Sequence, residues 1–340
     1  TCIDAASIKK IVQADASYSS KLGIVCGIMT ADCLPIFVSN KDGTMVGIAH
    51  AGWRGLVSGV IENLIKSFKS EGDNLIVHLG PGISKNFFEV GEGSKVVLLH
   101  SSASSASQWK PLMDNYSEKF HFIAINLIGY GKTSIWSGDK IQSLHDQVAL
   151  IDALPISKNE KFSIVGHSFG GSVAMKAAVQ FRDQIDKLTL VEPNPFYLLE
   201  YEGRKEAFEE VLILKDHIKR GFNNDWETAV SFFADYWNGN GTWNSLSTLQ
   251  KERFSKILMP NFYEWDAVFS ESSSFDFWQK NLPLNTTLIS ASKTVRTIKE
   301  LTELFELKCP SWNFHNYIGD HMTPVTNPNV VNPLIVRSLN

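Results

Sequence analysis

The chain of 340 residues has few cysteines, no long apolar run and no block of positive charge. Its four cysteines form no CxxC pair and are too few for a disulfide framework at this length, so reduced thiols are expected. No stretch approaches the roughly 18 apolar residues of a transmembrane helix, and no membrane partner is expected. Because the first residues lack the basic-then-apolar order of a signal peptide, a cytoplasmic location is expected.

The charge balance also argues against nucleic acid as a partner. The formal net charge is −4, and lysine and arginine never form a run of five or six, so the electrostatic footprint of a nucleic-acid-binding protein is missing. A small, largely uncharged partner fits this balance better. With 44% hydrophobic and 20% charged residues, the composition is that of a globular protein, and the length allows one large domain or two ordinary ones.

Two parts of the chain differ in pattern, and the change falls at a polar, glycine-bearing stretch, residues 92–95. Before it, short apolar runs alternate with one amphipathic helix over residues 56–68, which predicts a mixed α and β segment over residues 1–92. After it, the pattern predicts a separate domain over residues 93–340.

The second part alternates apolar strands with helical patterns. The predicted strands cover residues 96–100, 122–126, 162–165, 187–191 and 287–290. Such alternation is typical of the α/β class, a mostly parallel sheet with helices on both faces. A helical segment rich in aromatic residues, about residues 195–285, interrupts the strands and is predicted to form a cap over the carboxyl edge of the sheet. Some of its aromatic side chains are expected to line an apolar pocket.

The sharpest motif is Gly-His-Ser-Phe-Gly-Gly at residues 166–171, between the predicted strand 162–165 and a helical run over residues 172–181. This order of strand, turn and helix is the context that a G-x-S-x-G nucleophile turn requires. The glycines admit a strained, tight turn, and the helix N-terminus faces developing negative charge. Ser168 is therefore predicted to be a nucleophile.

A serine hydroxyl needs a base to take its proton, and histidine has the pKa suited to that task. Of the nine histidines, His321 lies after the last predicted strand and before the C-terminal helix. The chain order serine, acid, histidine requires the base there, so His321 is the predicted base. His167, beside the serine, is expected to point into the fold, and His315 is a weaker candidate because it lies in the preceding segment.

The third member must be a carboxylate that orients the imidazole. The turn after the predicted strand 287–290, the usual position, contains no acid. Glu192 follows residues 187–191 and stands at the carboxyl end of the neighbouring strand, so it is the predicted acid. Asp320, adjacent to His321, is the competing candidate.

Acyl chemistry at a serine also needs N–H donors aimed at the oxyanion. Phe169, directly after the nucleophile, supplies one by its position. The second is predicted at Ser102, in the turn that begins at His100. His100 is expected to help hold that turn, and a buried structural histidine is an equally good interpretation.

The nucleophile turn, the turn at His100 and the closing string at residues 319–326 together resemble the α/β-hydrolase superfamily over residues 93–340. They look like its esterase-like branch with a Ser-His-Glu triad, in which Glu-Pro follows the sixth strand. Ser101 departs from that pattern, because the family usually has glycine there. The resemblance implies a serine hydrolase without a cofactor, a carboxylesterase that forms an acyl-enzyme on a small or medium apolar ester. Hydrolysis of C–C bonds is the alternative within the same fold.

The first ninety residues carry two further motifs. Cys33 lies in Thr-Ala-Asp-Cys-Leu-Pro-Ile and His50 in Ala-His-Ala-Gly-Trp-Arg-Gly, at the ends of adjacent predicted strands. Thiolate and imidazole are both zinc ligands, but two ligands do not complete a site. These strings, with Gly-Pro-Gly-Ile at residues 80–83, resemble the laccase-like multicopper polyphenol oxidase family, whose members look like zinc-dependent purine nucleoside phosphorylases.

This second resemblance implies a zinc or copper ion at Cys33 and His50, and an oxidoreductase or phosphorylase as the alternative activity of the chain. The family's upstream histidine has no counterpart before Asp15, and the resemblance ends near residue 91. The segment is therefore interpreted as truncated, with a packing or dimerisation role as the non-enzymatic alternative. Because the hydrolase part begins at what looks like its third strand, residues 75–79 and 87–90 are predicted to supply its missing edge strands.

Overall fold

The computed structural model describes residues 2–5, 14–29, 34–52, 55–56, 58–68, 74–79 and 87–340. It separates into two compact units, Thr1–Asn86 and Phe87–Asn340. The boundary expected after residue 92 falls inside the second unit, because the strand Phe87–Val90 pairs with that unit's sheet.

The described part of the first unit forms a five-stranded sheet in the order β1-β2-β4-β3-β5. The strands are β1 (Cys2–Asp4), β2 (Ala16–Ser19), β3 (Leu34–Asn40), β4 (Val46–Ala51) and β5 (Leu75–Leu79). The pair β1 and β2 is parallel, and the other pairs are antiparallel. Helix α2 (Val60–Ser67) buries Val60 and Leu64 in the core of this unit. The mixed character is as predicted, but the prediction that residues 75–79 join the hydrolase sheet is wrong, because β5 pairs with β3.

The second unit is built on a seven-stranded sheet in the order β12-β11-β10-β9-β7-β8-β6. The strands are β6 (Phe87–Val90), β7 (Ser94–Leu99), β8 (Phe120–Ile125), β9 (Phe162–His167), β10 (Ile185–Val191), β11 (Thr287–Ala291) and β12 (Asn313–Tyr317). Neighbouring strands are parallel except β6 with β8 at one edge. The predicted parallel sheet and the recruitment of residues 87–90 are confirmed. The sequence patterns miss β12, because its polar sequence lacks an apolar run.

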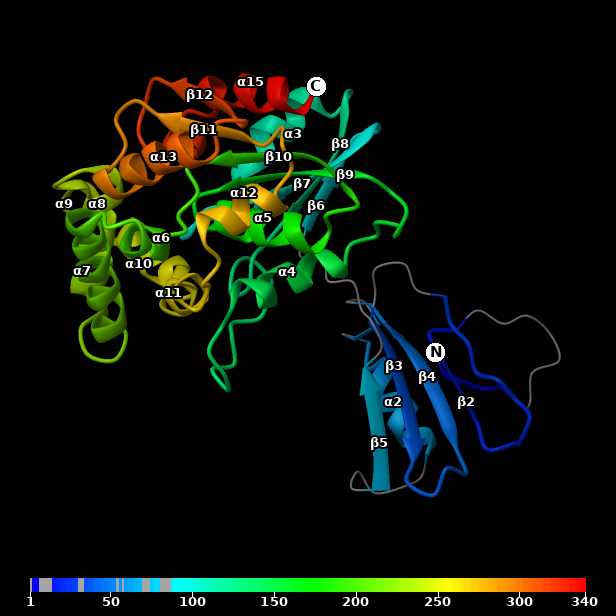
Figure 1. Cartoon of the computed structure of the whole chain (residues 1–340). Coiled ribbons are helices and arrows are strands. Elements are labelled where there is room, and N and C mark those ends of the chain that lie inside the picture. The colour runs from blue at the N-terminus through cyan, green and yellow to red at the C-terminus, as the bar shows by residue number, and fades with distance from the viewer. Residues whose placement is uncertain are drawn as a thin grey trace. The chain divides into compact units, whose positions relative to one another are not determined.

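Side chains of the sheet alternate between two cores, one on each face. Along β7, Val97 and Leu99 belong to one core, and Val96 and Leu98 belong to the other. The covering helices are α3 (Lys110–Tyr116), α4 (Leu144–Asp152), α5 (Phe169–Gln180), α13 (Arg296–Lys308) and α15 (Pro328–Leu339). Figure 1 shows α3 and α15 on one face of the sheet and α4 and α5 on the other. Because both faces are covered, β9 is buried at every residue.

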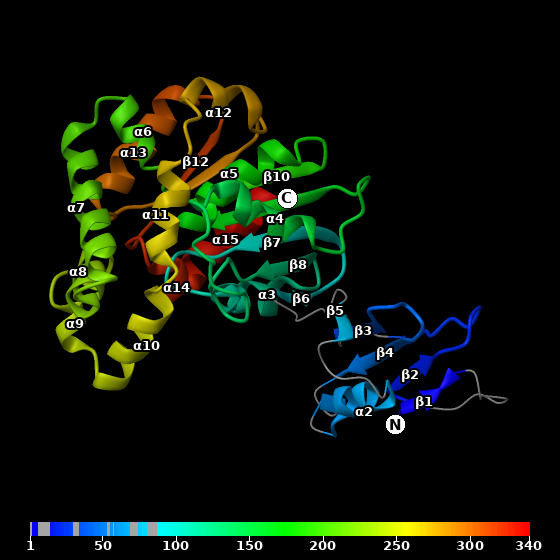
Figure 2. The same ribbon diagram turned by 90° about the horizontal axis from the view of Figure 1, so that it is seen from below.

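The helices between β10 and β11 form a cap, in the segment where the aromatic-rich helical pattern lies. They are α6 (Tyr197–Tyr201), α7 (Lys205–Gly221), α8 (Trp226–Asn238), α9 (Thr242–Ser245), α10 (Thr248–Leu258), α11 (Asn261–Phe269) and α12 (Phe275–Asn281). Figure 2 shows α7, α8, α10 and α11 grouped at one end of the sheet. No helix in the described part of the chain is both long and apolar enough to cross a membrane.

Candidate active site

Ser168 lies on a sharp turn between β9 and α5, with a φ of 54° and a ψ of −117°. A residue other than glycine rarely has a positive φ, so this turn is strained. The neighbouring glycines make the turn sterically possible, because a Cβ at Gly170 would overlap the main-chain carbonyls of Leu99 and His100. The turn places the Ser168 side chain at the N-terminus of α5, the electropositive end of the helix.

Two further residues at this edge of the sheet have a positive φ. Ala103 (52°) follows β7 and Glu192 (45°) follows β10, and these two strands flank β9. Among the non-glycine residues that the structure describes, these two and Ser168 are the ones with a positive φ. Backbone strain of this kind clusters at functional sites, so the strain marks the same edge of the sheet as the sequence motif does.

The imidazole of His321 lies between the serine and a carboxylate. Its Nε2 lies 3.0 Å from Ser168 Oγ, and its Nδ1 lies 2.7 Å from Glu192 Oε2. All three residues are buried. Because an ionised carboxylate only accepts hydrogen bonds, Nδ1 carries the proton and Nε2 accepts from the serine O–H. This tautomer is the one that a base acting on Ser168 requires.

Glu192 is held in place by the neighbouring strand. Its Oε1 accepts a hydrogen bond from the N–H of Ala291 at 2.7 Å, and its Oε2 accepts one from Thr294 Oγ1 at 3.0 Å. Both donors lie at the end of β11 or in the turn after it, the place where the sequence contains no acid. This turn therefore supplies donors to a carboxylate from the adjacent strand instead of supplying the carboxylate.

Asp320, the competing acid, faces its own turn. Its Oδ1 accepts from the N–H of Met322 and from Thr323 Oγ1, each at 3.0 Å. The residue is exposed. The structure therefore brings Glu192, and not Asp320, to the imidazole of His321.

His167 points into the fold, as the sequence predicts. Its Nε2 lies 3.0 Å from the main-chain O of His321, and its Nδ1 lies 3.0 Å from Nε2 of Gln108. Since a carbonyl only accepts, Nε2 carries the proton and Nδ1 accepts from the amide of Gln108. Burial, and then the nearby His321, lower the pKa of His167 well below its ordinary value, so the ring is neutral. His315 lies within β12, paired with Ile289 of β11.

Gln108 is a residue of the site that the sequence patterns miss. It lies in the short 3₁₀ helix η3 (Ala106–Trp109), and its Oε1 accepts from both the N–H and the Oγ of Ser101, each at 3.1 Å. Its amide NH₂ group donates to His167 Nδ1, and Gln108 thereby connects the turn after β7 to the segment that carries His321. No local signal identifies it, because its partners lie in other parts of the chain.

The two predicted oxyanion residues, Ser102 and Phe169, line one pocket together with Ser168. Phe169 is the first residue of α5, so its N–H has no acceptor within the helix. The N–H of Ser101 is bonded to Gln108, which leaves the N–H of Ser102 as the donor that the turn after β7 can offer.

His100 fits both interpretations drawn from the sequence, because it is buried and it supports the turn. Its Nδ1–H donates to the main-chain O of Ser101 at 2.7 Å, and its Nε2 accepts from the N–H of Leu127 at 3.0 Å. Burial lowers the pKa of His100 to about 4, so the ring is neutral near pH 7 and its Nε2 can accept.

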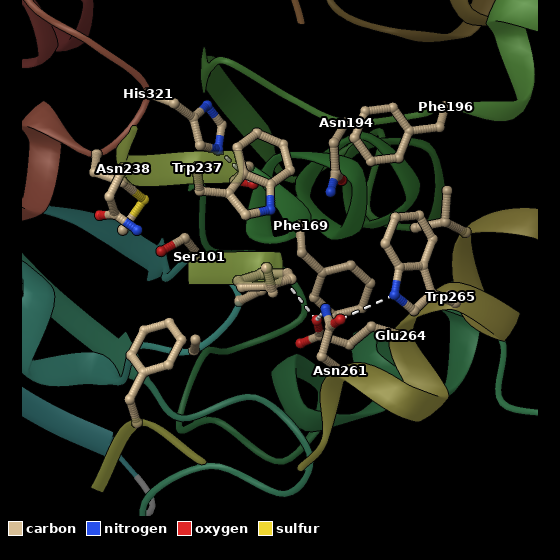
Figure 3. Close-up of a pocket in the computed structure, with 17 residues that line it drawn as sticks. Ser101, Phe169, Asn194, Phe196, Trp237, Asn238, Asn261, Glu264, Trp265 and His321 are labelled. Atoms are coloured by element: carbon tan, nitrogen blue, oxygen red, sulfur yellow. Dashed lines mark hydrogen bonds between the residues drawn. The ribbon is translucent and has the colours of Figure 1, made fainter. Parts of the chain in front are cut away.

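The pocket beside Ser168 lies between the sheet edge and the cap. It contains about 540 Å³ of space not filled by protein, part of it open to solvent. The cap supplies Phe233, Trp237, Asn238, Phe254, Asn261, Glu264, Trp265 and Val268. Trp237 packs against the imidazole of His321, with ring centroids 4.3 Å apart. Figure 3 shows the aromatic rings of Phe169, Phe196 and Trp265 around the same space, which suits an apolar group.

A carboxylate lies buried in the wall of this pocket. Glu264 on α11 accepts hydrogen bonds from Ser102 Oγ at 2.5 Å, from Tyr130 OH at 2.7 Å and from Asn261 Nδ2 at 2.7 Å. Burial raises the pKa of Glu264 above its ordinary value. The sequence patterns miss this residue, because nothing local distinguishes it from the other acidic residues of the cap.

The predicted metal ligands lie in the first unit. His50 is half-buried in β4, opposite Pro35 of β3, whereas Cys33 lies outside the described residues. In the part of the chain that the structure describes, no three histidine, cysteine, aspartate or glutamate side chains are grouped so that they could hold a metal ion. The zinc or copper site at Cys33 and His50 stays a prediction.

Comparison with known proteins identifies the fold of the second unit. The family model described as alpha/beta hydrolase fold matches residues 95–293. An esterase from Thermogutta terrifontis is 19% identical, with a TM-score of 0.57 over 74% of this chain and 92% of that one. An enol-lactonase from Burkholderia xenovorans LB400 is 13% identical, with a TM-score of 0.58 over 74% of this chain and 95% of that one. At these sequence identities the likeness shows a shared fold and nothing more.

The N-terminal part resembles a different family. The family model described as multi-copper polyphenol oxidoreductase laccase matches residues 1–128. Purine nucleoside phosphorylase YfiH of Escherichia coli (strain K12) is 39% identical over 129 residues, which are 38% of this chain and 53% of that protein. The chain thus spans about half the length of such curated relatives. Both resemblances indicated by the motifs are confirmed, although this match runs past residue 91 into a stretch that the hydrolase family model also covers.

Proposed function

Because the chain belongs to the alpha/beta hydrolase fold family, we propose that its second unit is a serine hydrolase that cleaves carboxylic esters. The observation that carries the proposal is the line of hydrogen bonds from Ser168 Oγ through the imidazole of His321 to the carboxylate of Glu192. In this proposal Ser168 is the nucleophile, His321 is the base and Glu192 is the acid that orients the base.

The first half-reaction transfers the acyl group to the enzyme. His321 Nε2 takes the proton as Ser168 Oγ attacks the ester carbonyl, and Glu192 stabilises the imidazolium that forms. The N–H groups of Ser102 and Phe169 donate to the oxyanion. The imidazolium then gives its proton to the leaving oxygen, so the alcohol departs and Ser168 carries the acyl group.

The second half-reaction releases the acid. His321 takes a proton from water as the water oxygen adds to the acyl carbonyl, and it returns that proton to Ser168 Oγ when the acyl bond breaks. The free carboxylic acid leaves, and the starting state is restored. Because these residues account for every proton and bond in the cycle, the proposed reaction uses no cofactor.

The proposed substrate is a small or medium apolar ester. The aromatic lining of the pocket supports this class, because rings such as Phe196 and Phe233 bury apolar groups well. Proteins of the same fold include the esterase from Thermogutta terrifontis and carboxylesterases of Nitrososphaera gargenis. A meta-cleavage product hydrolase also has this fold, so hydrolysis of a C–C bond by the same three residues is the alternative.

For the first unit we propose no phosphorylase or oxidase activity of its own. Cys33 and His50 are the two predicted metal ligands, and two ligands alone do not hold a catalytic zinc ion. Metal analysis of the purified chain tests this point, and a stoichiometric zinc or copper ion with nucleoside phosphorolysis would contradict it. The cytoplasmic location, and the lack of membrane and nucleic-acid partners, stay predictions from the sequence.

The main test is hydrolysis of p-nitrophenyl esters, from acetate to laurate, by the wild type and by Ser168→Ala. We expect activity that is abolished in the variant, lost to a serine-directed organophosphate and unaffected by a chelator. Activity that survives in Ser168→Ala, or that only the chelator removes, would overturn the proposal. Labelling of Ser168 by the organophosphate without any ester hydrolysis would favour C–C substrates instead.

A further inference from the structure

The pocket beside Ser168 contains a buried carboxylate that has no cationic partner among the residues that the structure describes. Glu264 is 2% exposed, and its three hydrogen-bond donors, Ser102, Tyr130 and Asn261, are all neutral side chains. None of the described residues that line the pocket is a lysine or an arginine. A negative charge at Glu264 is therefore stabilised by hydrogen bonds and is not neutralised.

The surrounding hydrogen bonds fix Glu264 as an acceptor. Tyr130 OH accepts the N–H of Ala103 at 3.1 Å, so the hydroxyl proton is directed to Glu264 Oε1. Asn261 Oδ1 accepts from Trp265 Nε1 at 2.9 Å, which turns the amide NH₂ group toward Glu264 Oε2. Burial raises the pKa of Glu264, and the hydrogen bonds counteract that rise because donors oriented by other bonds face both oxygens and stabilise the ionised carboxylate. Figure 3 shows Asn261, Trp265 and Glu264 together at one side of the pocket.

A second buried carboxylate adds to the negative potential. Glu192 is fully buried behind the imidazole of His321, which is neutral when it acts as a base. An ester bound between the sheet edge and the cap thus contacts one carboxylate, Glu264, and lies near a second, Glu192, while the described lining contains no lysine or arginine side chain. Charges in such partly buried surroundings are weakly screened, so a third negative charge on the substrate is strongly disfavoured.

We propose that Glu264 is a specificity-determining residue that rejects esters carrying a negative charge near the scissile bond. This inference rests on the proposed esterase function of the Ser168 site and adds the charge of the substrate to it. Esters with uncharged acyl and alcohol groups are accepted, and esters with a carboxylate on either group are discriminated against.

The test uses two pairs of esters matched in shape, in which a carboxylate replaces an isopropyl group. In the alcohol part, p-acetoxybenzoate is compared with p-isopropylphenyl acetate. In the acyl part, p-nitrophenyl hydrogen adipate is compared with p-nitrophenyl 6-methylheptanoate. The measured quantity is the selectivity ratio, kcat/KM of the neutral ester over kcat/KM of the anionic one, at one pH and one ionic strength. Effects on the triad cancel in this ratio.

In Glu264→Gln we expect the selectivity ratio to fall by on the order of 30-fold, the effect of one unit charge several ångström away in partly buried surroundings. The matched control Glu209→Gln removes the same charge from an exposed position on α7 and should leave the ratio unchanged. Tyr130→Phe removes one hydrogen bond to Glu264 but keeps its charge. That variant should change the rates of the neutral and the anionic ester together, which separates charge from positioning.

A selectivity ratio unchanged in folded Glu264→Gln would overturn the inference, while hydrolysis that depends on Ser168 would still support the esterase. The thermal unfolding midpoint checks that the variant is folded. If the variant is not folded, the selectivity ratio of the wild type is divided by the same ratio measured for hydroxide-catalysed hydrolysis of the two esters. A quotient near one contradicts the inference. If neither neutral ester is hydrolysed through Ser168, the proposed function fails instead.

Discussion

His167 donates a hydrogen bond from Nε2 to the main-chain carbonyl of His321, at 3.0 Å. The residue beside the proposed nucleophile thus holds the backbone of the proposed base, and the two rings lie with centroids 5.1 Å apart. Through Nδ1 the same ring is bonded to Gln108, which in turn holds the N–H of Ser101. One buried histidine therefore connects the two segments whose distances from Ser168 matter for the proposed chemistry.

Replacing His167 by asparagine should lower kcat for ester hydrolysis by roughly 10- to 100-fold, with little change in KM, because a small displacement of His321 costs about that much. Steady-state kinetics and the rate of organophosphate labelling measure the effect. His145→Asn, at an exposed position of α4, is the matched control. A His167→Asn variant with the kcat of the wild type would show that this bond does not position the base.

The two candidate acids differ in their expected effect on turnover. Glu192→Gln should lower kcat by about ten-thousand-fold, because the amide no longer accepts the Nδ1–H bond that sets the tautomer of His321. Asp320→Asn should lower kcat by less than about ten-fold, since asparagine Oδ1 can still accept from Met322 and Thr323. Kinetics at saturating ester, with unfolding midpoints for both variants, make the comparison. Equal losses in the two variants would contradict the assignment.

The packing of Trp237 on His321 should contribute to both stability and activity. Trp237→Ala should cost about 3 to 5 kcal/mol of unfolding free energy, because it opens a cavity between cap and sheet edge, and it should lower kcat. Trp237→Phe should retain most of the stability and most of kcat, since the buried Nε1 of Trp237 has no hydrogen-bond partner within residues 87–340. Denaturant unfolding and ester kinetics measure the two effects. Equal losses in the two variants would argue against packing as the cause.

The buried His100 should make the protein less stable in mild acid. Its pKa in the folded state is about 4, whereas an unfolded histidine titrates near 6.5. As the pH falls below about 6.5, the unfolded chain gains a proton that the folded chain does not, so stability is lost progressively down to about pH 4. The loss approaches about 3 kcal/mol, and His167 adds to it in the same direction.

Urea midpoints between neutral pH and about pH 4.5 check this expectation. His100→Gln removes the titrating group, so its midpoint should depend less steeply on pH, although its stability at neutral pH is lower. If the variant and the wild type lose stability equally over this range, another group is responsible.

Local patterns in the sequence were sufficient to predict the parallel sheet and the turn at Ser168. The strand 162–165 and the glycines around Ser168 are neighbours in the chain, and steric demand at the turn leaves few alternatives. The sheet to which each edge strand belongs was harder to predict, because residues 75–79 and 87–90 are both short apolar runs. Which sheet each one joins depends on pairing with a distant strand, β3 for one and β8 for the other.

By itself the sequence determined the elements whose signals are local: the nucleophile turn, the position of His321 after the last predicted strand, and a carboxylate after β10. The tertiary structure decided which side chains meet at the sheet edge. It brings Glu192 to His321, turns Asp320 toward its own turn, and places Gln108 and Glu264 beside the serines that follow β7. These contacts join residues far apart in the chain, and their geometry follows from how parallel strands and the cap pack, which no local pattern records.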